Sequence, residues 1–167
     1  MTVVGSYVLP EVLAVGLKVV ICGSAAGTKS ALVGAYYAGP GNQFWGMLCR
    51  VGLTPNVLRP DEFRQVLTYG IGLTDIVKEA FGADRDLRSS DFDREDLCTR
   101  IMAIQPNNLV FNGKRAARAF FGIRSDYGYQ VGRDLGRTRV YVAPSTSGAA
   151  RKFWNEQIWR EIALAVT

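Results

Sequence analysis

Apolar positions along the chain form two patterns, short continuous runs and stripes at helical spacing. The continuous runs, bounded by Gly, Pro and polar residues, predict buried strands. They are Leu17–Cys22, Asn108–Phe111 and Arg139–Ala143. The stripes, with turn or capping residues at their ends, predict helices. They cover Asn42–Leu53, Pro60–Leu67, Asp93–Gln105, Arg115–Phe121 and Ala149–Val166.

The remaining segments are expected to connect these elements. Tyr69–Val77 is a glycine-punctuated turn that leads into a short buried piece, residues 82–92 are a polar exposed loop, and Gly122–Gly136 is glycine-rich and irregular. Strands that alternate with helices predict an α/β fold, with a mainly parallel sheet covered on both faces. The chain has 167 residues, 48% of them hydrophobic, which is enough for one substantial core. We therefore expect a single domain over residues 1–167.

Charge and residue content narrow the classes of function. The formal net charge is +5, and 15 of the 20 basic residues are arginines, which favours a polyanionic partner or a surface with dispersed cations. The chain has no histidine, so Ser-His-Asp hydrolysis, Cys-His proteolysis and histidine-ligated metal sites are excluded.

Cysteine spacing and hydropathy point to a reduced, non-membrane environment. Cys22, Cys49 and Cys98 lack CxxC spacing, so the sequence indicates neither a disulfide framework nor a zinc or iron–sulfur site. We interpret them as reduced cytosolic thiols and expect a cytoplasmic protein without a bound metal. The apolar segment Val8–Val20 contains Pro10, Glu11 and Lys18, and no apolar run approaches 18 residues, so no signal peptide or membrane span is expected.

Two loops of small residues follow predicted strands, and an aromatic loop lies between them in sequence. The small-residue loops are Gly23–Gly27 and Pro144–Gly148, and the aromatic loop is Tyr36–Trp45. Loops at the carboxyl ends of strands form the ligand crevice of an open α/β sheet. Residues 23–30 are not a nucleotide-binding P-loop, because the second glycine of that motif is replaced by Thr28.

Five segments resemble the motifs of the uracil-DNA glycosylase superfamily and follow one another in the same order as those motifs. Within the superfamily, the resemblance is closest to the mismatch-specific uracil and thymine-DNA glycosylases. The segments are Leu17–Gly27, Tyr36–Trp45, Tyr69–Val77, Phe111–Lys114 and Pro144–Gly148. The resemblance implies a three-layer α/β/α sandwich. It also implies an enzyme that flips a damaged base out of duplex DNA and hydrolyses its N-glycosidic bond without a cofactor. The expected partner is double-stranded DNA with a damaged or mispaired base, and the expected state is a monomer.

The departures from the mismatch-specific pattern concern catalysis. Ala25 stands where that family carries the Asn that positions the attacking water, and Ala143 replaces the usual Asn that opens the second motif. The loop Tyr36–Trp45 and the run Pro144–Ser147 are also similar to the hypoxanthine-DNA glycosylases, which take a catalytic amide from that loop. The matching residue is Asn42, which could equally cap the following helix.

Further candidate residues are named for their places in these motifs. Asp75 is the only acid within the crevice motifs, so it is a second catalytic candidate, with a helix N-cap as the alternative. Tyr37 matches the aromatic residue that stacks on the flipped base, with a structural core role as the alternative. The predicted base-binding residues are Gly23, Ser24, Ala25, Gly27, Tyr37 and Asn112.

The predicted DNA contacts follow the second motif and the third strand. They are Ser145, Thr146, Ser147, Gly148, Arg151 and Lys114, with Arg115 beside them. Capping of the last helix and ordinary solvated charges are the alternatives for these residues. Phe153, Trp154 and Trp159 are expected to lie in the core.

Three functions stay open from the sequence alone. The first is a monofunctional DNA glycosylase that removes uracil, with hypoxanthine or 5-substituted uracil as further substrates. The second is a damaged-base or abasic-site binding protein that lost catalysis together with the motif Asn. The third is an unrelated α/β nucleotide-binding enzyme.

Overall fold

A five-stranded sheet organises the computed structural model, which describes residues 6–167. Its spatial order is β2-β1-β3-β5-β4, and all neighbouring pairs are parallel except β4 with β5. The strands are β1 (Val19–Gly23), β2 (Ile71–Asp75), β3 (Asn108–Asn112), β4 (Gly128–Tyr129) and β5 (Arg139–Ala143).

The apolar runs become strands because both sides of the sheet are covered. Every residue of β1, β2 and β3 is buried. Along β1, Val19 and Ile21 pack into one core cluster, while Val20 and Cys22 pack into the other. Alternate residues of an extended strand point to opposite faces, so one continuous apolar run supplies two cores.

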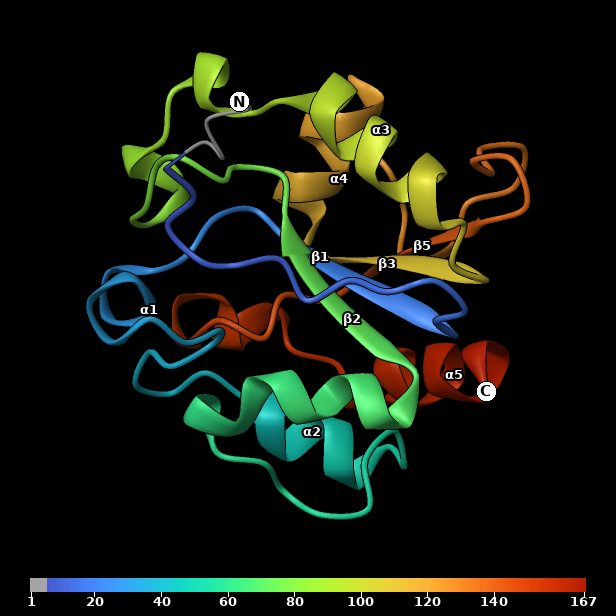
Figure 1. Cartoon of the computed structure of the whole chain (residues 1–167), viewed down its shortest axis with the longest axis horizontal. Helices are drawn as coiled ribbons and strands as arrows, with labels where there is room; N and C mark the ends of the chain where they lie inside the picture. Colours follow the sequence, from blue (N-terminus) through green and yellow to red (C-terminus); the bar gives the residue numbers. More distant parts are fainter. Residues whose placement is uncertain (1–5) are drawn as a thin grey trace.

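Helices form the outer layers, as Figure 1 shows. On one face lie α2 (Phe44–Arg50), the 3₁₀ helix η1 (Pro60–Tyr69) and α5 (Glu156–Val166). On the other face lie α3 (Arg94–Ile104) and α4 (Lys114–Phe121). The prediction of a three-layer α/β/α fold with a mainly parallel sheet is confirmed.

The prediction of one continuous helix over Ala149–Val166 is wrong, because this segment is interrupted. Residues 148–153 form a separate 3₁₀ helix, η4 (Gly148–Phe153), and α5 begins only at Glu156. Between them, Trp154 is extended, and the Asn155 side chain accepts a hydrogen bond of 3.1 Å from the Gln157 N–H. This is an N-cap, which starts a new helix and ends the previous one. The break leaves Phe153 61% exposed, so its predicted place in the core is also wrong, whereas Trp159 is buried.

Smaller differences lie in the connections. The helix α1 (Thr28–Val33) was not predicted, and the glycine-rich segment 122–136 contains the short strand β4. Among residues 6–167, no helix combines the length and the hydropathy that a membrane span requires.

Candidate active site

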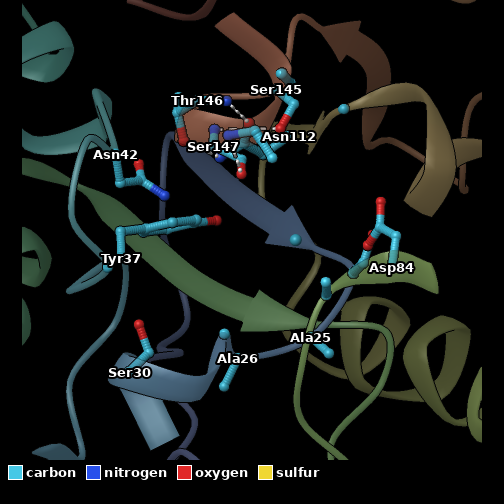
Figure 2. A pocket seen from close by; sticks show the side chains of 18 of the residues that line it. Ala25, Ala26, Ser30, Tyr37, Asn42, Asp84, Asn112, Ser145, Thr146 and Ser147 are labelled. Carbon is cyan, nitrogen blue, oxygen red and sulfur yellow. Dashed lines mark hydrogen bonds between the residues drawn. The ribbon is translucent and has the colours of Figure 1, made fainter. Parts of the chain in front are cut away.

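A pocket of about 750 Å³ opens at the carboxyl ends of the parallel strands. Three predicted segments meet there: the loop after β1, the aromatic loop before α2, and the loop after β5. Figure 2 shows Tyr37 and Asn42 on one side, Asn112 and the Ser145–Ser147 loop on a second, and Ala25 with Asp84 on a third. The topology thus gathers motifs that are more than a hundred residues apart in sequence into one crevice.

Asn42 combines a local structural contact with a group that faces the pocket. Its side-chain Oδ1 accepts a hydrogen bond of 3.0 Å from the Phe44 N–H, at the first residue of α2. This bond stabilises the turn that leads into α2, which begins two residues later than predicted, and the N-cap residue is Gln43, not Asn42 as predicted. Because the oxygen is held by the backbone, the amide NH₂ group is directed toward the pocket (Figure 2).

Tyr37 forms the wall beside Asn42. Its ring stacks on Phe44, with centroids 3.9 Å apart and an angle of 29° between the planes. Phe44 in turn meets Trp45 edge to face. One face of the Tyr37 ring is thus covered by the core, which fixes the orientation of the ring toward the pocket.

Asp75 is the last residue of β2 and lines the pocket while only 3% exposed. Burial, which penalises the charged form, raises the pKa of this carboxyl from 3.8 to about 6. Glu11 raises this pKa as well, while Lys78, Arg100 and a backbone hydrogen bond at Gly23 lower it. No helix begins at Ile76, whose N–H donates to the Gly23 carbonyl instead, so the capping alternative for Asp75 is wrong.

A buried group of charges supports the end of β2 from behind. Glu11 accepts from Lys78 at 2.7 Å and from Arg100 at 3.0 Å, and the Thr74 hydroxyl donates to the same carboxylate at 2.9 Å. Arg100 also donates to the Asp75 backbone carbonyl at 3.2 Å. These contacts hold the backbone of Asp75 in place with the carboxyl facing the pocket.

The loop after β1 is fixed by its own carbonyl groups. The carbonyls of Gly23, Ser24, Ala26 and Gly27 each accept a backbone hydrogen bond from elsewhere, at distances from 2.8 to 3.0 Å. The Ala25 side chain is half-buried in the pocket wall and carries no polar group. A Cβ built at Gly27 would meet nothing within 4 Å, so this end of the pocket is open.

Asn112 joins the third strand to the second motif. Its amide donates to the Thr146 hydroxyl at 3.0 Å, and its carbonyl accepts from the Thr146 N–H at 3.0 Å. Thr146 has no exposed surface, and its carbonyl accepts from the Gln43 N–H at 2.9 Å. These bonds give Thr146 a structural role. Ser145 and Ser147 remain as the half-buried hydroxyls at the pocket.

The loop after β5 also rests against the aromatic loop. Gly148 approaches so closely that a Cβ there would lie 3.1 Å from the Pro40 carbonyl oxygen. The expected capping contact is present at Ser147, whose side chain accepts from the Ala149 N–H at the start of η4. Arg151 is exposed, and its guanidinium lies beside Gly41 at the tip of the aromatic loop.

Basic and aromatic residues line the mouth of the pocket. Lys114 and Arg115 are exposed there, with the Lys114 ammonium 4.4 Å from the centre of the Tyr127 ring. Phe153, which the sequence pattern placed in the core, lies at the same mouth. All the predicted site residues except Arg151 line this pocket, and Arg151 lies at its edge.

Asp84 is a pocket residue that the sequence reading missed. Burial raises the pKa of its carboxyl, which Ser24 and Arg115 lower. Asp84 is exposed and belongs to the polar loop at residues 82–92, and the pattern of that loop does not indicate which of its residues borders the pocket. Within residues 6–167, no three His, Cys, Asp or Glu side chains are grouped as a metal site would need.

Comparison with known proteins bears on the fold and the family of this chain. The solution NMR structure of a candidate uracil DNA glycosylase from Methanosarcina acetivorans has a TM-score of 0.65 and 21% sequence identity, over 95% of this chain and 96% of that one. At this identity the likeness shows the fold. Residues 10–163 match the family model of the uracil DNA glycosylase superfamily, which covers nearly the whole chain. The chain therefore belongs to the uracil DNA glycosylase superfamily, whose members are DNA glycosylases acting on DNA.

Proposed function

We propose that this protein is a monofunctional DNA glycosylase that flips uracil out of double-stranded DNA and removes it by hydrolysis, as the first step of base-excision repair. Hypoxanthine and 5-substituted uracils are its further substrates. The observation that carries this proposal is the orientation of Asn42, whose amide NH₂ faces the pocket because Phe44 holds its oxygen. An amide in this position can hold the attacking water, a task for which Ala25 has no polar group.

The chemistry defines what the pocket must supply. Cleavage of the glycosidic bond passes through an oxocarbenium-like sugar and an anionic leaving base, so a water must be positioned and two charges stabilised. We assign the positioning of the water to Asn42. Asp75 is the second catalytic group, because an ionised carboxylate can accept the proton of the water and stabilise the sugar cation.

Base and DNA contacts follow from the same placement. The free face of the Tyr37 ring is proposed to stack on the flipped base, and stacking on an aromatic ring contributes about 1–3 kcal/mol. The backbone of residues 23–27 and Asn112 border the base edges. Ser145, Ser147, Gly148, Arg151 and Lys114 are proposed to contact the DNA backbone and the gap that the base leaves. Thr146 holds this loop in shape.

The placement of the two lysines in the pocket segments, Lys29 and Lys114, supports a hydrolytic route over a lyase. Lys29 is exposed on α1, and Lys114 lies over the Tyr127 ring at the pocket mouth. A Schiff base at the sugar needs a lysine amine within the pocket. We propose that the chain acts as a single domain and as a monomer.

The open end of the pocket supports a broad substrate range. Gly27 leaves space where a bulky side chain would exclude a C5 substituent or a larger ring. The chain also has no histidine to stabilise the leaving anion. We therefore expect slow excision that is faster for mispaired than for paired uracil, because unpairing a mismatched base costs less.

Release of base from end-labelled oligonucleotides under single-turnover conditions tests the proposal. We expect cleavable abasic sites from G·U, A·U, single-stranded uracil and hypoxanthine substrates, with G·U faster than A·U. Asn42→Ala serves as the control for a contaminating glycosylase. Equal and fast excision of uracil in every context, with none of hypoxanthine, would refute the proposed breadth.

Ala25 and Ala143 favour one alternative, a protein of the same fold that binds damaged bases or abasic sites without turnover. Tight binding to uracil-containing duplex with no base release in the same assay would establish that alternative.

A further inference from the structure

The backbone of Tyr37 is strained. Its φ is 52°, in the left-handed region that a bulky residue seldom adopts. The neighbouring residues clamp it on both sides, since the Tyr36 carbonyl accepts from the Trp45 indole N–H at 3.1 Å and the Ala38 N–H donates to Ser30 Oγ at 2.9 Å. Strain of this kind costs about 1–3 kcal/mol and persists where the surrounding structure imposes it. The fold therefore holds this side chain in place at a cost to the stability of the protein.

The hydroxyl group of Tyr37 is buried and lacks a hydrogen-bond partner among residues 6–167. Figure 2 shows this oxygen directed toward the middle of the pocket, away from the core. An unpaired buried hydroxyl costs about 1–3 kcal/mol, so such groups in native structures require an explanation. Stacking needs only the ring and does not account for the hydroxyl.

Two neighbours define what the hydroxyl can do. A Cβ built at Gly23 would lie 3.2 Å from the Tyr37 oxygen and 2.6 Å from Asp75 Oδ1, so both oxygens reach the end of β1 because residue 23 has no side chain. Burial and the nearby Asp75 raise the pKa of the Tyr37 phenol well above 10, while the polar Asn112 side chain, which lies close to the phenol and is itself bonded to Thr146, lowers it. The phenol consequently keeps its proton at neutral pH and can act as a donor.

The neighbouring tyrosine provides an internal comparison. The Tyr36 hydroxyl donates to the Pro10 carbonyl at 2.9 Å and lies 3.2 Å from the Lys78 ammonium, which donates to it. Two adjacent tyrosines thus differ in one respect that matters here: one hydroxyl is fully paired inside the protein, and the other is not.

We propose that the Tyr37 hydroxyl donates a hydrogen bond to a carbonyl oxygen of the flipped base, and that this bond strengthens as the base departs. The inference rests on the proposed function and adds a donor to it. Because the hydroxyl has almost no exposed surface in the free protein, the contact forms as the base seats and the loop adjusts around it. The base class it selects carries a carbonyl beside the ring nitrogens, as uracil and hypoxanthine do.

The step balances without any further reactant. The bond between C1′ and the base nitrogen breaks, and its electron pair moves into the base and onto the carbonyl oxygen. The water oxygen bonds to C1′, and its proton passes to the Asp75 carboxylate or to solvent. Tyr37 keeps its proton throughout and stabilises the new negative charge, a task for which the chain has no histidine.

Tyr37→Phe tests the inference because it removes only the oxygen. Single-turnover excision of uracil should slow by about 100-fold, the effect expected for one positioned donor. The thermal midpoint of the free protein should stay equal or rise, because the variant loses an unpaired polar group. Tyr36→Phe is the matched control for stability: it removes a paired hydroxyl, so its thermal midpoint should fall.

Binding provides a second readout that does not depend on turnover. Tyr37→Phe should weaken affinity for a duplex carrying an uncleavable 2′-fluoro-2′-deoxyuridine. Its affinity for the same duplex with a tetrahydrofuran abasic analogue should match that of the unchanged protein, since no base carbonyl is present.

The outcomes separate the inference from the proposed function. Unchanged excision by Tyr37→Phe, or a lower thermal midpoint, would overturn the inference. A wild-type protein that releases no base would refute the proposed function, and the two duplex affinities would still decide whether the hydroxyl contacts the base.

Discussion

The two walls of the pocket, the loop after β5 and the aromatic loop, differ in how many of their polar groups are hydrogen-bonded within the protein. In the loop after β5, Thr146 uses its N–H, hydroxyl and carbonyl in bonds to Asn112 and Gln43. In the aromatic loop, the Asn42 NH₂ and the Tyr37 hydroxyl have no bonded partner within residues 6–167. Both walls are well ordered by contacts at their bases. The comparison indicates that one wall is a scaffold and the other is prepared for a ligand.

Two asparagines make the comparison sharp, because they carry the same amide at the same pocket. Both the NH₂ group and the oxygen of the Asn112 side chain are hydrogen-bonded to Thr146. In Asn42 only the side-chain oxygen is bonded, and it accepts from the Phe44 N–H. Satisfied polar groups stabilise a fold, and unsatisfied ones cost stability unless a substrate pairs with them. Substitutions on the two walls should therefore separate activity from stability.

The largest effect is expected at Asn42. Asn42→Ala should reduce single-turnover excision by about 100-fold or more, because it removes the amide that positions the water. Binding to uncleavable uracil duplex should change much less. Rapid-quench kinetics and fluorescence anisotropy measure the two quantities.

Asp75→Ala is the companion variant for this experiment. If Asn42→Ala keeps a near-normal rate while Asp75→Ala is inactive, the water belongs to Asp75 and the assignment is reversed. Normal rates in both variants would remove both residues from catalysis.

The next effect concerns how much the buried, ionised Asp75 carboxylate lowers the free energy of unfolding. Its pKa is raised in the folded protein, from 3.8 to about 6. The neutral form is therefore favoured by folding, and the resulting stability is present below pH 4 and lost as pH rises through 6. Asp75→Asn, which cannot ionise, should be more stable than the unchanged protein at pH 8 by up to about 3 kcal/mol, with the difference vanishing near pH 4.

Urea unfolding at pH 4, 6 and 8 measures this difference directly. The rate of excision should fall below pH 6 if the ionised carboxylate is the active form. A variant that is less stable than the unchanged protein at pH 8 would show that Lys78, Arg100 and the Gly23 backbone together outweigh the cost of burying the ionised carboxylate.

A smaller effect on stability, of opposite sign, is expected on the scaffold wall. Asn112→Ala removes two hydrogen bonds and leaves the buried Thr146 hydroxyl and N–H unpaired, which should lower the free energy of unfolding by about 2 kcal/mol. Asn42→Ala, measured in the same way, should cost about 1 kcal/mol, the usual net value of one hydrogen bond. Equal losses at both positions would abolish the distinction between the walls.

The smallest effect concerns the charged edge of the pocket. Affinity for DNA should fall with added salt, with a slope near −0.9 for each phosphate contact. Arg151→Ala should change that slope by one contact at most and should mainly reduce discrimination between mispaired and fully paired DNA. Titrations at several salt concentrations measure both, and a slope near zero would show that these cations do not contact DNA phosphates.

Features with strong local signals could be predicted from the sequence. Continuous apolar runs fixed the places of β1, β3 and β5, since a parallel strand is buried on both faces. The order of the motifs placed Tyr37, Asn42, Asp75 and Asn112 around one crevice, where the structure has them. The break before α5 was not predicted, because Asn155 lies within an apolar pattern at helical spacing. Nothing in that pattern distinguishes it from an ordinary exposed residue, and only its hydrogen bond to the Gln157 N–H identifies it as a cap.

Features that depend on tertiary contacts could not be predicted in this way. Nothing local distinguishes the unpaired hydroxyl of Tyr37 from the paired one of Tyr36, nor marks Tyr37 as left-handed. Asp84 borders the pocket, although it is exposed, because its loop is tied to the first motif, where the Gly82 N–H donates to the Ala26 carbonyl. In the sequence, Glu11 is merely an acid that interrupts an apolar segment.

The role of Glu11 has a practical consequence for the boundaries of the domain. Lys78 is 5% exposed and pairs with Glu11 at 2.7 Å, whereas Arg100 pairs with both Glu11 and Asp96, at 3.0 and 2.9 Å. A shortened protein that starts after residue 11 would keep every motif residue and every strand. It would nevertheless leave the buried Lys78 ammonium without the Glu11 carboxylate that neutralises it, beneath the pocket. We therefore expect a stable domain to include Glu11, which precedes the first recognisable motif.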